Sequence, residues 1–172
     1  MTQEELGIIL GASKQTISNW ETGYTPIPLN KLVRFANLYD YSLDFLVGFT
    51  RKNIKYNKSI KLDKKLIGKN LKLLREKLKL TQQELSDKCD LYQSTYNHYE
   101  NGYSLIKIMP AYSICKTYNV SMDWLVGRTN NKKIVWIINL NHTIFIMSDD
   151  GMTANFGWVP PIFSCHCCHY FL

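Results

Sequence analysis

Five potential metal ligands lie side by side near the end of the 172-residue sequence: Cys165, His166, Cys167, Cys168 and His169. Cysteine and histidine bind Zn²⁺, but a tetrahedral site normally has two or more residues between ligands so that the backbone can wrap around the ion. Five adjacent side chains cannot all point at one ion, and no second ligand pair occurs in this segment. The pattern favours an accidental cluster, and we expect no metal and no cofactor.

Catalytic chemistry is not indicated elsewhere in the sequence. We find no nucleophile paired with a base, no phosphate-binding loop and no paired carboxylates in a suitable setting. The sequence therefore predicts a protein that is not an enzyme, and it identifies no small-molecule ligand.

The positive charge of the chain is concentrated in one stretch. The formal net charge is +7, and residues 51–79 alone hold 12 basic and two acidic side chains. Clustered lysine and arginine attract a polyanion, because contact with phosphates releases condensed counterions. A solvated basic face or linker explains the same composition, so charge alone leaves nucleic-acid binding open.

The sequence gives no indication of secretion or of a membrane span. Glu4 and Glu5 interrupt the start of the chain, which lacks the order of a signal peptide. The most apolar stretch, 134–147, is too short and too polar to cross a bilayer. Five unevenly spread cysteines do not resemble a disulfide framework. We expect a cytoplasmic protein without a membrane partner.

An internal repeat is the main feature of the sequence. Residues 1–50 align with residues 80–129 without a gap at a constant offset of 79, and 16 of the 50 pairs are identical. MTQEELGIILGASKQTISNWETGY corresponds to LTQQELSDKCDLYQSTYNHYENGY, and YDYSLDFLVGFT corresponds to YNVSMDWLVGRT. The chain is therefore expected to contain two copies of one unit.

Hydrophobic spacing before the second copy predicts a first helix. Ile67, Leu71, Leu74 and Leu78 form one apolar stripe at helical spacing, over about three turns. The first copy begins at Met1, directly before its second helix, and has no such stripe.

Four further short helices are expected in the second copy. Thr81 followed by Glu84 is a capping box at the start of the second helix. A third helix runs over 93–100, a fourth over 108–118, and Ser121 caps a short fifth. The fold class is all-α: two tandem five-helix domains, of which the first lacks its helix 1.

The residue order of both copies resembles the Xre family of helix-turn-helix proteins, the phage Cro and repressor-like group. Each copy has T-Q-x-E-L, a turn, T-[IY]-x-x-[WY]-E-x-G and S-x-D-[FW]-L-V-G. The resemblance implies that the second and third helices of the unit form the motif. The third helix would lie in the major groove of double-stranded DNA, where polar side chains near its N-terminus reach base edges.

The resemblance divides the chain into four parts. Residues 1–50 are a truncated Xre-type domain, 51–64 a basic linker, 65–129 a complete domain, and 130–172 a tail of unknown role, open between β-structure and disorder. Three explanations compete for the missing helix. A truncated or wrongly started reading frame is favoured over a helix donated from elsewhere and over a decaying copy.

The resemblance also assigns DNA-contacting residues, although an exposed helix face explains each of them taken singly. Glutamine can make a bidentate contact with adenine, and lysine can donate to guanine. The base-facing positions map onto Lys14, Gln15, Ser18 and Asn19 in the first copy and onto Gln93, Ser94, Asn97 and His98 in the second. Phosphate contacts are expected from Gln3, Gln82, Lys61, Lys64 and Lys65.

A structural ion pair is implied by the same resemblance. Arg75 in the first helix would pair with Glu100, as part of the scaffold rather than of the recognition surface. The first copy has Glu21 but no counterpart of Arg75. Without a first helix, four apolar residues are expected to lack a surface to pack on: Leu6, Leu10, Ile17 and Trp20.

The turn between the two motif helices differs between the copies. Gly11 and Ser13 suit a left-handed turn and a helix cap. Their counterparts are Asp90, which tolerates the left-handed region, and Tyr92, which caps poorly. Some affinity or stability is expected to be lost in the second copy.

Arg51–Lys64 is interpreted as a tether between the two copies. Fourteen residues reach at most about 48 Å when extended and around 20 Å as a coil. Successive major grooves on one face of DNA are about 34–36 Å apart. The tether would let both copies occupy adjacent half-sites.

The tail differs from the rest of the chain. Lys132–Met147 is rich in isoleucine and predicts a strand or hairpin. The tail is either an oligomerisation or partner-binding piece or the product of translation past the natural end of a family member.

The sequence therefore predicts a sequence-specific regulator of transcription that binds double-stranded DNA, with homodimerisation left open. The alternative is a protein-interaction module, antitoxin-like or an oligomerising adaptor, that has lost specific DNA binding. Salt-dependent and sequence-selective binding to duplex DNA separates the two.

Overall fold

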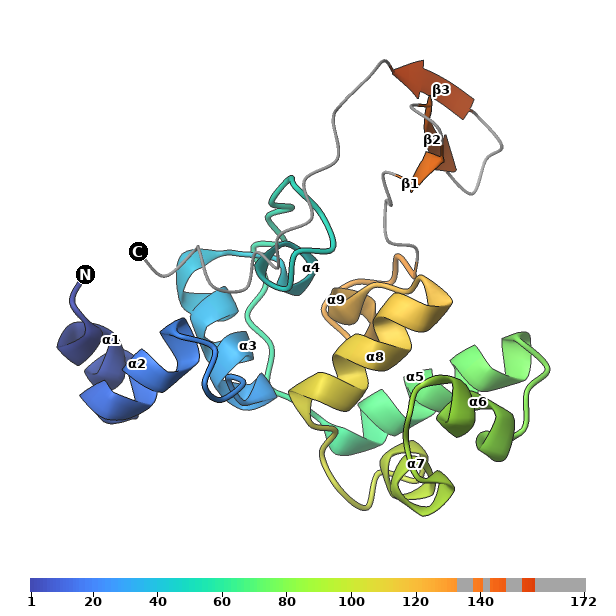
Figure 1. Ribbon diagram of the computed structural model, residues 1–172, viewed down its shortest axis with the longest axis horizontal. Coiled ribbons are helices and arrows are strands. Elements are labelled where there is room, and N and C mark those ends of the chain that lie inside the picture. Colours follow the sequence, from blue (N-terminus) through green and yellow to red (C-terminus); the bar gives the residue numbers. More distant parts are fainter. Residues whose placement is uncertain (133–137, 141–142, 148–152, 157–172) are drawn as a thin grey trace.

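The computed structural model describes residues 1–132, 138–140, 143–147 and 153–156. Within residues 1–132 all regular structure is helical, in agreement with the predicted all-α class (Figure 1). The N-terminal module consists of α1 (Gln3–Leu10), α2 (Lys14–Glu21), α3 (Leu29–Tyr39) and α4 (Leu43–Leu46). The C-terminal module consists of α5 (Lys64–Lys77), α6 (Gln82–Lys88), α7 (Gln93–Glu100), α8 (Ile108–Tyr118) and α9 (Met122–Leu125).

Local capping sets where the motif helices begin. Thr2 and Thr81 each form a capping box, in which the threonine hydroxyl accepts from the backbone of Glu5 or Glu84 and that glutamate accepts from the threonine N–H. These boxes satisfy amide groups that have no partner within the helix. The box at Thr81 confirms the prediction from the sequence.

The turns between the motif helices also follow the sequence chemistry. Gly11 and Asp90 both have left-handed backbones, with φ of 64° and 58°. Ser13 caps α2 by accepting from the backbone of Thr16, whereas Tyr92 makes no side-chain cap at α7. The predicted difference in turn chemistry is therefore present.

Helix α5 supplies one wall of the C-terminal core. Ile67, Leu71 and Leu74 are buried, and the backbone oxygen of Leu71 accepts a hydrogen bond of 3.3 Å from the fully buried Tyr96 of α7. The prediction that Leu78 completes this stripe is wrong, because 41% of it is exposed. Leu78 is the C-cap residue of α5, where the chain turns away from the core.

The N-terminal module has a small core of its own. Leu6, Leu10 and Ile17 are at most 3% exposed and pack with Phe35 of α3, while Trp20 is partly buried against them. The expectation that these residues lack a surface to pack on is therefore wrong. Phe35 of α3 thus gives these residues an apolar surface within the module.

A larger core runs through both modules. Leu32, Ala36 and Leu43 of the N-terminal module belong to the same buried cluster as Leu71 and Ile114 of the C-terminal module. The modules thus share apolar surface, whose removal from water stabilises their association.

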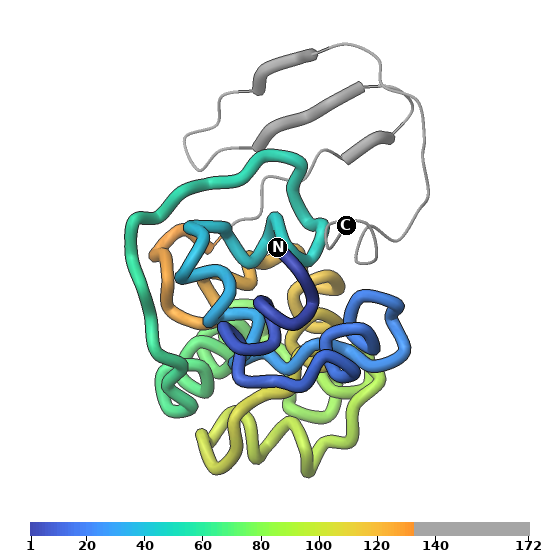
Figure 2. The backbone as a smooth tube through the Cα atoms, turned by 90° about the vertical axis from the view of Figure 1, so that its left-hand side faces the viewer, coloured from blue at the N-terminus to red at the C-terminus, as the bar shows by residue number. Residues whose placement is uncertain are grey.

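The segment between α4 and α5 is held against the modules rather than free. The Asn53 side chain accepts from the backbone N–H of Ser42 and donates to the backbone oxygen of Asp40. The backbone of Ile60 exchanges two hydrogen bonds with the side chain of Asn37. Figure 2 shows this segment running along the outside of the helices. The expectation of a free tether, extended or coiled, is corrected, because these contacts fix the course of the segment.

Three short strands follow the helices: β1 (Ile138–Leu140), β2 (Thr143–Met147) and β3 (Thr153–Phe156). They form an antiparallel sheet in the order β1-β2-β3, and Ile138 pairs with Phe145. Strands β1 and β2 fall in the segment for which the sequence predicts a strand or hairpin. The Cys165–His169 cluster lies outside the described residues. None of the helices described is long and apolar enough to cross a bilayer.

Candidate nucleic-acid interface

Helix α7 has a buried face and a polar face. Tyr96 and Tyr99 point into the core at no more than 5% exposure. Gln93, Ser94 and His98 are exposed, and Asn97 is partly buried. The four predicted base-facing residues of the second copy therefore lie on the side of α7 that solvent reaches. His98 also stands edge-on to the ring of Tyr103, with centroids 5.9 Å apart.

Gln82, at the start of α6, connects this polar face to the scaffold. Its Nε2 donates to Oε1 of Glu100 over 3.1 Å, and its Oε1 accepts from Nδ2 of Asn97 over 3.1 Å and from Nε2 of Gln93 over 3.4 Å. One amide thus holds two of the predicted base-facing side chains in place. Gln82 was expected from the sequence to contact phosphate, and this bracing role was not predicted.

Arg75 and Glu100 form the ion pair that the resemblance implied. Nη2 and Nε of Arg75 donate to the two carboxylate oxygens of Glu100 over 2.7 and 2.8 Å, and the Glu100 side chain is only 5% exposed. Burial by itself would raise the pKa of Glu100, but hydrogen bonds from Arg75, Gln82 and Tyr96 hold that pKa below its ordinary value. Glu100 is therefore a charged anchor for both Arg75 and Gln82.

Helix α2 presents the corresponding surface in the N-terminal module. Lys14 and Gln15 are exposed, whereas Ser18 and Asn19 are partly buried. Nζ of Lys14 lies 3.0 Å from the Glu4 carboxylate, in a pair whose two side chains are both well exposed. Nε2 of Gln15 donates to Oδ1 of Asn19 over 3.0 Å. The polar face is therefore organised within α1 and α2.

Side chains of two other helices, α1 and α3, support α2 and the turn before it. Nε2 of Gln3 donates to the Glu21 carboxylate over 2.6 Å, as Gln82 does to Glu100. Nζ of Lys31, on α3, donates to the backbone oxygens of Leu10 and Gly11 at the turn before α2. This role of Lys31 could not be predicted from the sequence, because only the fold brings α3 to this turn.

The three predicted phosphate-contacting lysines are exposed. Lys64 and Lys65 open α5 next to the end of α7, where Nζ of Lys64 donates to the backbone oxygen of Tyr103 and Gly102 lies against the Lys65 backbone. Lys61 lies in the segment before α5. Two of the three lysines therefore border the C-terminal end of α7.

Comparison with known proteins shows the family of this chain. The family model described as helix-turn-helix matches residues 1–46 and 71–125. An uncharacterized HTH-type transcriptional regulator of Bacillus subtilis (strain 168), YobD, is 36% identical over 63 residues, which cover 32% of this chain and 56% of that protein. The chain thus spans about half the length of this curated relative. Because the two segments matched by the family model together make up more than half of the chain, the chain belongs to the helix-turn-helix family.

Proposed function

We propose that this protein is a sequence-specific regulator of transcription of the Xre type, which inserts α7 and α2 into the major groove of double-stranded DNA. The observation that carries the proposal is the polar face of α7, on which Gln82 holds the amides of Gln93 and Asn97 while the opposite face is packed in the core. Braced side chains lose less conformational freedom on contact with a base.

The side chains on the two helices have the chemistry that base edges require. Gln93 and Asn97 of α7 and Gln15 of α2 carry amides that match the donor and acceptor of adenine in the major groove. Lys14 can donate to guanine once it leaves its exposed pair with Glu4. Each good contact contributes about 1–3 kcal/mol of discrimination.

The basic stretch 51–79 supports the proposal because it is expected to increase the affinity for DNA. Lys64 and Lys65 lie beside the end of α7, and Lys61 is exposed in the segment before them. Cations next to a groove-binding helix contact the phosphate backbone without reading sequence. Affinity is therefore expected to fall steeply as salt increases.

The test separates base contact from phosphate contact. A preferred duplex and a random duplex are titrated at several salt concentrations with the full chain and its variants. Gln93→Ala and Asn97→Ala are expected to reduce the preference for the selected sequence, by roughly 5- to 150-fold if each contact contributes about 1–3 kcal/mol. Lys61→Ala and Lys65→Ala are expected to weaken binding to both duplexes and to flatten the salt dependence.

Gln83→Ala is the matched control for the first pair of variants. Gln83 is an exposed glutamine next to Gln82 that bonds to Asp87 on its own helix, and it is not among the base-facing positions. This variant is expected to keep the sequence preference. Equal binding of the parent chain to selected and random duplexes at every salt concentration would overturn the proposal and favour the protein-interaction module.

A further inference from the structure

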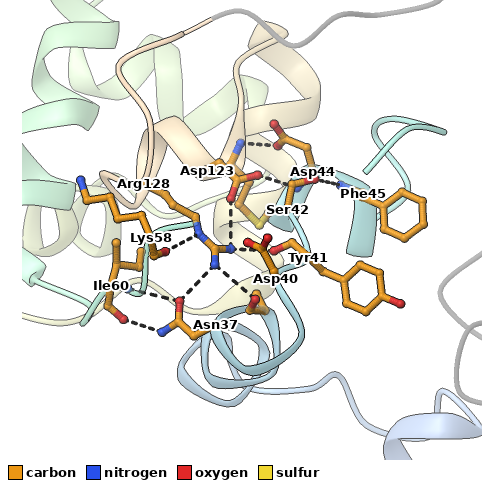
Figure 3. A network of polar contacts seen from close by, with 12 residues as sticks. Asn37, Asp40, Tyr41, Ser42, Asp44, Phe45, Lys58, Ile60, Asp123 and Arg128 are labelled. Atoms are coloured by element: carbon orange, nitrogen blue, oxygen red, sulfur yellow. Dashed lines mark hydrogen bonds and ion pairs between the residues drawn. The ribbon is translucent and has the colours of Figure 1, made fainter. Parts of the chain in front are cut away.

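The first turns of α4 and α9 bind each other through a reciprocal pair of carboxylates (Figure 3). Asp44 accepts from the backbone N–H of Met122 and from the hydroxyl of Ser121, both over 2.6 Å. Asp123 accepts from the backbone N–H of Asp44 over 3.0 Å, and the backbone N–H of Leu43 also donates to it. Each module thus caps the short helix of the other.

The contacting residues are counterparts in the sequence repeat. Asp44 and Asp123 are separated by the repeat offset of 79, as are Leu43 and Met122. At the two-fold axis of a homodimer, each contact between two residues is repeated with the roles of the two subunits exchanged, and such an interface is called isologous. Here the two modules take the place of the two subunits. The contacts therefore describe a pseudo-two-fold axis within one chain.

A second pair of counterparts, Phe49 and Arg128, also reaches across the axis. The ring of Phe49 stacks on Tyr112 of α8, with centroids 4.9 Å apart. The Arg128 guanidinium donates to the backbone oxygens of Tyr41 and Ala36 in the N-terminal module, over 2.6 and 3.2 Å. Phe49 and Arg128 occupy the same position of the repeat, but the first side chain is aromatic and the second is cationic.

The surface around the axis repeats this correspondence. An open groove between the modules is lined by residues of the segments 26–30 and 105–110, and 26–30 is the counterpart of 105–109. Leu29 and Ile108, one from each segment, belong to the single core cluster that continues through both modules. The reciprocal carboxylate contacts and the shared core thus follow one pseudo-symmetric arrangement.

The interface is buried and carries charge, which restricts its geometry. Asp44, Asp123 and Arg128 are 5%, 0% and 3% exposed. Arg128 lies 3.7 Å from the Asp123 carboxylate and also donates to the backbone oxygen of Lys58, in the segment that joins the modules. A buried charge that loses its partner is strongly destabilising, so the modules are held in one relative orientation.

We infer that the two modules form an intramolecular pseudo-dimer, so that one chain binds an operator of two unlike, inverted half-sites at a single fixed spacing. This inference rests on the proposed function. A two-fold arrangement of recognition helices requires inverted half-sites. The half-sites differ because α2 presents Lys14 and Gln15 where α7 presents Gln93 and Ser94.

Amide hydrogen exchange of the full chain tests the interface without DNA. The first amides of a helix have no partner within that helix, so in a four-residue helix they exchange fast unless another group holds them. In the parent chain we expect protection at Asp44 and Met122. Asp123→Ala should remove the protection at Asp44, and Asp44→Ala should remove it at Met122, in the other module each time. Unprotected amides at both positions in the parent chain would overturn the pseudo-dimer, whatever the DNA results.

If the aspartate variants fail to fold, two milder serine variants at counterpart positions provide the same test. Ser42 and Ser121 both cap their own helices, but Ser121 also donates to Asp44 across the interface. Ser42→Ala and Ser121→Ala therefore remove the same local cap. Only Ser121 also holds the Asp44 carboxylate that accepts from Met122, so only Ser121→Ala is expected to increase exchange at the first residue of its own helix, Met122. An equal increase at Leu43, the counterpart of Met122, in Ser42→Ala would contradict the inference.

Operator spacing tests the consequence for DNA. In the selected duplex, five or ten base pairs are inserted between the half-sites, about half and one full helical turn. A rigid pseudo-dimer loses the gain from its second half-site in both duplexes, a fall of about 10²–10⁴-fold. A flexible tether recovers binding in the ten-base-pair duplex, and that recovery would overturn the fixed spacing.

Sedimentation of the complex measures how many chains bind each duplex. It should give one chain per two-half-site duplex, and two chains would contradict the inference. Absence of any selected sequence is instead a failure of the proposed function.

Discussion

The two modules build the same motif with different amounts of support. In both, a glutamine at the start of one helix donates to the glutamate at the end of the next, over 2.6 Å from Gln3 to Glu21 and 3.1 Å from Gln82 to Glu100. Only the C-terminal module adds a preceding helix and a bidentate arginine, Arg75. The glutamine-to-glutamate bond is therefore common to both modules, and α5 with Arg75 adds support in the C-terminal one.

The glutamates show the difference most clearly. Glu100 is 8% exposed and bonds to Arg75, whereas Glu21 is partly buried and receives its bond from Gln3 alone. A carboxylate near solvent keeps part of its hydration and needs fewer partners. Glu21 is therefore expected to depend less on a cationic partner than Glu100 does.

The largest expected effect comes from removing the arginine. Arg75→Met leaves the Glu100 carboxylate buried without its main partner, which should lower the free energy of unfolding by about 3–5 kcal/mol. Urea unfolding of the full chain measures this. The matched change Glu21→Gln, at the other module's glutamate, should lower it by only about 1 kcal/mol, since it alters a single hydrogen bond. Equal losses of unfolding free energy in the two variants would show that the deeper burial of Glu100 does not make its partner more important for stability.

A pH effect is expected at the contact between the modules. Burial and then the neighbouring Asp123 carboxylate raise the pKa of Asp44 from 3.8 to about 7. Below about pH 4 both folded and unfolded chains are protonated there, and between about pH 4 and 7 only the unfolded chain loses the proton. The contribution of Asp44 to stability is therefore highest at acid pH, declines up to about pH 7 and is then level.

Asp44→Asn isolates this contribution from that of other acids. The pKa of Asp123 is also raised, by burial, and that of Glu100 is lowered, so the whole chain has a composite pH profile. The difference in unfolding free energy between Asp44→Asn and the parent should move in favour of the variant from about pH 4 to 7. Parallel profiles would show that Asp44 keeps an ordinary pKa.

The smallest expected effect concerns the caps of the two recognition helices. Ser13→Ala removes the cap of α2 and should lower the unfolding free energy by about 1 kcal/mol. Tyr92→Ser supplies a cap that α7 lacks, and should raise it by a similar amount. Thermal unfolding measures both. A loss of stability in Tyr92→Ser would mean that the tyrosine makes a contribution other than capping.

Helix positions could be predicted from the sequence because their signals are local. The capping box at Thr81, the cap at Ser121 and the apolar spacing from Ile67 to Leu74 each act within a few residues. Leu78 fits the same spacing but lies past the end of α5, where Lys79 adopts a left-handed backbone. Apolar periodicity predicts which face of a helix is buried, and the point at which the helix ends determines which residues of that face are in the core.

Contacts between the modules could not be predicted in the same way. Asp44 and Asp123 both occupy the first turn of a helix, where acidic residues are favoured in any protein. Nothing local shows that each carboxylate serves the other module's helix. The retention of both aspartates at the repeat offset is the one signal that the sequence offers. The packing of Leu6 and Leu10 on Phe35 likewise depends on a contact with a distant helix.

Whether α2 and α7 read base edges can be measured by selection from random duplex DNA with the full chain. We expect enrichment of a sequence with two unlike, inverted elements, one of which loses its enrichment when Gln93 and Asn97 are changed to alanine. A pool that stays random after repeated rounds, while the chain remains folded, would contradict it.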